Sequence, residues 1–150
     1  MNIVVIGPSY PFKGGISQYT TELYRQLSAR HQNQFITFKR QYPDWLYPGR
    51  GDRDSGNTPL REAGSLAIID SLNPLSWQRA VTAAAEFEPD MVIFPWWVMF
   101  WAPQFIYIAR GINRRCASTQ IVFLCHNVIA HEPGRLSNLL TRLTLRRGNA

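Results

Sequence analysis

The stretch NIVVIGPSYPFKGGISQYTTEL, residues 2–23, decides the fold that this chain is expected to adopt. Its apolar run at 3–6 predicts a buried strand, and the pair Gly14 and Gly15 opens a helix predicted over 16–30. Glycine has no Cβ, so a ligand can approach its backbone N–H closely, and the first N–H groups of a helix are unpaired and suit a phosphate. The stretch therefore predicts strand, turn and helix, with either a phosphate site or a turn that serves the fold alone.

The rest of the chain repeats this alternation of short apolar runs and longer helical patterns. Further strands are predicted at 35–38, 66–69, 91–94 and 121–124, and further helices at 74–87, 102–114 and 136–145. Continuous runs of Val, Ile and Phe are typical of strands that are buried on both faces. The prediction is an α/β fold, a Rossmann-like doubly wound parallel sheet in strand order 3-2-1-4-5. Ser17 or Thr20 is expected to help cap the first helix.

Composition fits one domain of 150 residues with a substantial core and a basic balance. The chain is 45% hydrophobic with a net charge of +6, and only Lys13 and Lys39 are lysines. An excess of arginine is compatible with nucleic acid, an anionic membrane face, phosphorylated substrates or genome composition alone. The arginines are scattered along the chain, so a nucleic-acid partner is not expected.

The two cysteines predict neither a disulfide framework nor a zinc motif. Cys125 lies in the apolar run IVFLC and is expected to be a buried thiol, whereas Cys116 follows a helix in a polar turn. There is no basic segment that precedes an apolar stretch at the start, and no apolar run reaches about 18 residues. We therefore expect a cytoplasmic location.

Residues 40–64, RQYPDWLYPGRGDRDSGNTPLREAG, break the rhythm of the elements. Connections of this length are uncommon inside compact domains and are often functional. Tyr42, Trp45 and Tyr47 alternate here with prolines. The segment is either a surface insertion or a lid that faces an acceptor.

A second polar constellation, HNVIAHE at 126–132, follows the fifth predicted strand. Ligands of open parallel sheets bind beyond the carboxyl ends of the strands, so His126 is expected at that edge with Asn127 beside it, across from the glycine turn. A zinc site with His131 and Glu132 fails on spacing, so no metal is expected. The alternative is that backbone groups at the end of the strand form the hydrogen bonds of the His126 imidazole, which then has only a structural role.

The segment FPWWVMFWAPQF, residues 94–105, holds three tryptophans and three phenylalanines. The segment either lines the core or forms a surface, which would be an acceptor groove or a membrane-facing patch. The surface alternative is considered because Trp prefers interfaces where one end of the ring contacts water.

Together these residues resemble the N-terminal half of family 4 glycosyltransferases, which are retaining enzymes of the GT-B fold. The resemblance spans essentially the whole chain, in order, and rests on GPSYPFKGGISQYTTEL (7–23), RQYPDWLYPG (40–49), SLNPLSWQRA (71–80) and FLCHNVIAHE (123–132). It implies transfer of a sugar from a nucleotide-sugar donor to a glycan or lipid-linked acceptor with retention, without a metal or other cofactor. It also implies work at the cytosolic face of the plasma membrane, in polysaccharide synthesis.

By the same resemblance, Gly14 and Gly15 bind the donor diphosphate and His126 is the catalytic-site histidine near the donor sugar. Asn127, Tyr42 and Trp45 would lie on the acceptor side. The family's diphosphate-clamping cations and paired glutamates belong to a C-terminal nucleotide-binding domain that is absent from residues 1–150, and the N-terminal domain itself is expected to be incomplete at its C-terminal end. Three interpretations follow: a fragment that is inactive alone, a half-enzyme that needs a complementing C-terminal chain, or a non-catalytic sugar- or membrane-binding module.

Overall fold

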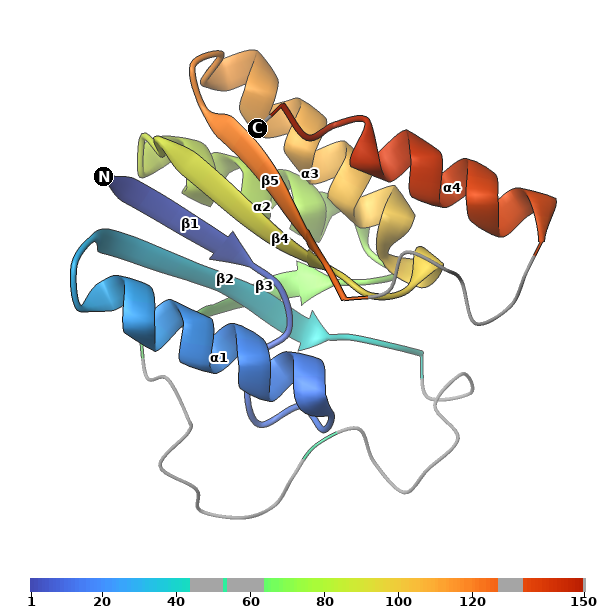
Figure 1. Ribbon diagram of the computed structural model, residues 1–150, viewed down its shortest axis with the longest axis horizontal. Coiled ribbons are helices and arrows are strands. Elements are labelled where there is room, and N and C mark those ends of the chain that lie inside the picture. The colour runs from blue at the N-terminus through green and yellow to red at the C-terminus, as the bar shows by residue number, and fades with distance from the viewer. Residues whose placement is uncertain (44–52, 54–63, 127–133, 150) are drawn as a thin grey trace.

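The computed structural model describes residues 1–43, 53, 64–126 and 134–149, which form a parallel sheet with helices on both faces (Figure 1). The elements follow the chain as β1 (Asn2–Ile6), α1 (Gly15–Ser28), β2 (Gln32–Arg40), β3 (Leu66–Asp70), α2 (Pro74–Glu86), β4 (Met91–Trp96), the 3-10 turn η1 (Met99–Trp101), α3 (Ala102–Arg115), β5 (Gln120–Cys125) and α4 (Arg135–Leu145). The α/β class and every predicted strand and helix are confirmed.

The five strands are all parallel and lie in the order β3-β2-β1-β4-β5, as predicted. The chain builds outward from β1 in one direction through β2 and β3, then returns to the other side of β1 for β4 and β5. The strand order therefore reverses between β1 and β4. In open α/β sheets, ligands bind beyond the carboxyl ends of the strands at this reversal.

Two phenylalanines of β2, three positions apart, show how the helices are divided between the two faces. Phe35 packs against Tyr24 of α1, with ring centroids 5.0 Å apart. Phe38, which points to the other face, packs against Phe105 of α3 at 6.4 Å. Thus α1 covers one face, and α2 and α3 cover the other, where α4 lies beside α3 (Figure 1).

The aromatic segment after β4 belongs mostly to the core. Phe94, Trp96, Trp101 and Phe105 are buried, whereas Trp97 keeps 39% of its surface exposed. Of the two interpretations of this segment, the core accounts for four of its rings. Trp97 is at the surface because it follows β4, where the chain leaves the sheet.

Two side-chain predictions are wrong. Gly14 is the N-cap of α1 and makes no side-chain cap, while Ser17 and Thr20 are buried. The Thr20 hydroxyl donates instead to the Ile16 carbonyl one turn earlier, at 2.7 Å. Cys125 is exposed rather than buried, because β5 is an outer strand and Cys125 is its last residue.

The residues after α4 return to the outer edge of β5. The Asn149 backbone N–H donates to the Ile121 carbonyl at 3.1 Å, and the Asn149 Oδ1 accepts from the Ile121 N–H at 2.6 Å. Its amide also donates to the Thr119 carbonyl at 3.2 Å. Asn149 therefore satisfies both outward-facing backbone groups of Ile121.

Candidate functional site

The glycine pair lies at the start of α1, beyond the carboxyl end of β1. Gly14 has φ +114°, a conformation that side chains with a Cβ rarely adopt. A Cβ placed on Gly14 or Gly15 would meet no atom within 4 Å among the described residues. The helix also has no side-chain cap, so no capping side chain bonds its first N–H groups. This is the arrangement in which a helix end can receive an anion.

Gly7 in the same turn has a different role. A Cβ on Gly7 would lie 2.6 Å from the Cγ of Pro95 in β4, closer than such atoms can approach. The residue therefore allows the end of β1 to pack directly on β4. Gly7 serves the packing of the sheet, whereas Gly14 and Gly15 leave space in front of them.

His126 follows β5 at the same edge of the sheet. Its backbone N–H donates to the Trp96 carbonyl at 2.9 Å, which extends the β4–β5 pairing by one residue. Its imidazole meets the ring of Tyr19 edge to face, with centroids 4.5 Å apart and planes at 79°. Tyr19 comes four residues after Gly15 in α1, about 6 Å along the helix axis. The structure thus places His126 against the first turns of the helix that the glycine pair opens.

Burial lowers the pKa of His126 below the ordinary value of a histidine, since desolvation disfavours the imidazolium. The imidazole is therefore neutral at pH 7. Its Nε2 atom is shielded from solvent and has no hydrogen-bond partner within the part of the chain that the structure describes. A buried polar atom left unpaired costs about 1–3 kcal/mol, so it calls for an explanation such as a ligand.

The other predicted site residues are divided between the core and the undescribed segments. Tyr42 is partly buried, and its ring packs 5.5 Å from that of Phe100 and 6.1 Å from that of Trp101. Tyr42 thus anchors the start of the segment that follows β2 to the aromatic core. Trp45 and Asn127 lie outside the described residues.

Tyr19 is the site residue that sequence reasoning missed. Its spacing of four from Leu23 indicated only a helical repeat, yet 43% of its surface is exposed and its ring contacts His126. The buried face of α1 is formed instead by Ser17, Thr20 and Thr21. An aromatic residue one turn after a glycine pair, on a helix whose small residues face inward, is the signal that could have identified it.

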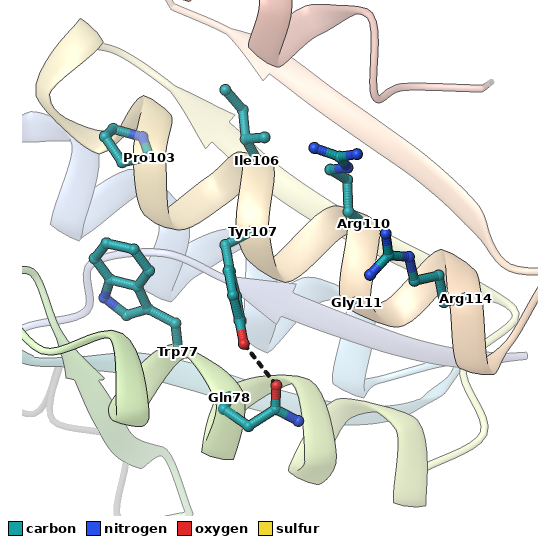
Figure 2. Close-up of a pocket in the computed structure, with 8 residues that line it drawn as sticks. All are labelled: Trp77, Gln78, Pro103, Ile106, Tyr107, Arg110, Gly111 and Arg114. Atoms are coloured by element: carbon teal, nitrogen blue, oxygen red, sulfur yellow. Dashed lines mark hydrogen bonds between the residues drawn. The ribbon is translucent and has the colours of Figure 1, made fainter.

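A separate groove lies on the opposite face of the sheet, between α2 and α3 (Figure 2). Its volume is about 400 Å³, and its lining residues are Trp77, Gln78, Pro103, Ile106, Tyr107, Arg110, Gly111 and Arg114. The predicted site residues do not line this groove.

The described ranges contain no group of three or more His, Cys, Asp or Glu side chains placed to hold a metal ion. No helix within these ranges is long and apolar enough to cross a membrane. Comparison of the chain with family models, curated proteins and solved structures gives no match.

Proposed function

We propose that this chain is the acceptor-side domain of a retaining glycosyltransferase of the GT-B class, which uses a nucleotide-sugar donor. The observation that carries the proposal is the Nε2 of His126, which has no partner among the described residues, beside a helix start that has no side-chain cap. The two halves of this arrangement come from opposite ends of the chain and meet at the carboxyl edge of the sheet. The proposal also rests on the sequence resemblance to family 4 glycosyltransferases.

The helix start suits the leaving group of such a reaction. When the bond between sugar and diphosphate breaks, negative charge develops on the diphosphate oxygens. Backbone N–H groups at the start of α1 are fixed donors, and the helix end carries partial positive charge. Preorganised donors of this kind lower the barrier because they need not reorient as charge develops.

A neutral imidazole suits the position of His126 near the donor sugar. A lowered pKa keeps a positive charge off the ring, so the imidazole offers a hydrogen bond rather than an ion pair. The unpaired Nε2 would bond a sugar hydroxyl as donor or acceptor, depending on which ring nitrogen carries the proton. The nucleotide itself would be held by a second domain that faces this edge, as the resemblance implies.

Two substitutions at Gly15 test the helix-start part of the proposal. Gly15→Pro removes one backbone donor, and proline is well tolerated at the first position of a helix. Gly15→Ala keeps the donor and adds a Cβ where none of the described atoms lies within 4 Å. The probes are nucleotide sugars and, as a simpler case, inorganic pyrophosphate. We expect both to shift the Gly15 amide resonance of the native chain. They should also shift the amide resonances around position 15 in the Gly15→Ala variant. Gly15→Pro should weaken pyrophosphate binding.

The same titration tests His126. Nucleotide sugars should shift both its imidazole signals and the α1 amides, whereas pyrophosphate should shift the amides more strongly. If millimolar nucleotide sugar and pyrophosphate leave both sets of signals unchanged, the proposed site is wrong.

A further inference from the structure

From the groove between α2 and α3 we infer a second binding site, for a phosphate monoester carried on a planar ring, of the nucleoside monophosphate type. The site lies on the opposite face of the sheet from His126 and does not depend on the proposed function. Its two ends differ in chemistry, with aromatic side chains at one and arginines at the other (Figure 2).

The cationic end consists of Arg110 and Arg114, one turn apart on α3. Both side chains are exposed and line the groove, and neither has a hydrogen bond or ion pair with any described residue. Like charges four residues apart on a helix repel each other, and α3 contains no acidic residue to offset them. A phosphate dianion would relieve this repulsion, because guanidinium groups bind phosphate oxygens through paired N–H donors.

The aromatic end is formed by Trp77 of α2 and Tyr107 of α3, whose ring centroids are 5.9 Å apart at an interplanar angle of 62°. Trp77 is fixed in place, since its Nε1 donates to the Asp70 carbonyl at 2.8 Å. Figure 2 shows Tyr107 between Trp77 and the two arginines. Aromatic side chains held in this way offer a stacking surface for a planar ring, and such stacking is tolerant of the identity of the base.

The middle of the groove adds a further donor. The Tyr107 hydroxyl donates to the Gln78 Oε1 at 2.8 Å, which fixes the amide and leaves its NH₂ group for an acceptor. Arg110 follows Tyr107 by about one turn and Arg114 by about two, which is about 4.5 and 10.5 Å along the helix axis. A planar ring at Tyr107 and a phosphate near the arginines therefore fall within the reach of one nucleotide.

The shape of the groove is set by a close helix–helix contact. A Cβ on Gly111 would lie 2.6 Å from the Cγ2 of Val81, so α2 and α3 approach each other closely at this point. The two walls are thereby fixed relative to each other without a bound ligand. A preformed site loses less free energy when it binds than one that must first be ordered.

The experiment is a calorimetric titration of the native chain with adenosine monophosphate, with adenosine, ribose phosphate and inorganic phosphate as comparison probes. We expect one site that binds adenosine monophosphate more tightly than any of the three. The double variant R110Q/R114Q should weaken adenosine monophosphate binding at least tenfold, since charge-assisted hydrogen bonds to phosphate are about twice as strong as neutral ones. Trp77→Leu should lower the affinity for adenosine monophosphate but leave the affinity for ribose phosphate unchanged.

Arg115 provides the matched control, because it is on the same helix but donates to the Thr82 hydroxyl at 3.1 Å and does not line the groove. Arg115→Gln should change the affinity by less than twofold. An equal loss with Arg115→Gln would mean general attraction to a basic surface and would overturn the inference. So would an affinity for adenosine monophosphate no higher than that for inorganic phosphate, or no binding at millimolar concentration.

Amide spectra locate the bound probe. The Gly111 amide and the Trp77 indole N–H should shift on titration. Shifts confined to Gly14 and Gly15 would place the nucleotide at the start of α1 and would overturn the groove as its site.

Discussion

Replacing His126 by phenylalanine should stabilise the protein, although it removes the residue to which we assign the central role. Phenylalanine keeps a ring of similar size against Tyr19 and eliminates the buried Nε2 that lacks a partner among the described residues. An unpaired buried polar atom costs about 1–3 kcal/mol. Because the rest of the imidazole is partly exposed, we expect a gain at the lower end, about 1 kcal/mol, or roughly 3 °C in Tm for a domain of this size.

The pH dependence of stability provides a second, independent test of this prediction. Burial lowers the pKa of His126 in the folded state, while the unfolded chain keeps the ordinary value of about 6.5. As the pH falls below that value, the unfolded chain binds a proton that folded His126 does not yet accept. The contribution of neutral His126 to the free energy of unfolding is therefore present above about pH 6.5 and is lost as the pH falls toward the lowered pKa. The gain in stability of His126→Phe over the native chain should therefore be larger at low pH than at neutral pH.

The assay is urea unfolding of both proteins, followed by circular dichroism at about pH 7.5 and about pH 5.5, on either side of the unfolded pKa. The difference between the two proteins isolates the titration of this one residue, because all other groups are shared. His126→Ala serves as the comparison that also removes the ring contact and should be destabilised. A His126→Phe variant that is less stable than the native chain by the same amount at both pH values would refute the cost assigned to the buried Nε2.

Three further predictions concern packing and are each measured by urea unfolding. Gly7→Ala should cost about 1–3 kcal/mol, because its Cβ would lie 2.6 Å from the Cγ of Pro95, whereas Gly15→Ala should have an effect below about 0.5 kcal/mol; equal effects would contradict the separate roles of the two glycines. Trp101→Ala should cost about 3–5 kcal/mol, since the side chain is fully buried, and Trp97→Ser, 39% exposed, should cost clearly less; the reverse order would reject the packing of this segment. Asn149→Ala should cost about 1 kcal/mol by removing its side-chain bonds to Ile121 and Thr119, and an unchanged stability would show that those bonds contribute nothing.

The arrangement of the sheet could be predicted because its information is local. Short apolar runs such as 91–94 identify strands buried on both faces, and their alternation with helices fixes a parallel sheet. The ends of the elements are harder to predict: the strand predicted at 35–38 is longer in the structure, where β2 spans Gln32–Arg40. Its additional residues are polar, and they pair through backbone groups that no side-chain pattern reports.

The interior of the candidate site could not be predicted, because it depends on contacts between distant parts of the chain. The resemblance and the strand pattern indicated that His126 follows the last strand, but not that Tyr19 touches it. The exposure of Cys125 likewise depends on what covers β5, which the apolar run around it does not encode. Such features arise from tertiary packing, which can override the local pattern.

The attachment of Asn149 to Ile121 has a consequence for the order in which the native chain opens. Segments that few bonds tie to the rest of a fold open at a low free energy. Here Asn149, four residues after the end of α4, is hydrogen-bonded to Ile121, so the carboxyl end of α4 cannot separate from β5 without breaking these bonds. We therefore expect α4 and the outer strand to exchange their amide hydrogens as one cooperative unit, with similar opening free energies. The turn after α4 thereby couples the opening of this helix to the opening of β5.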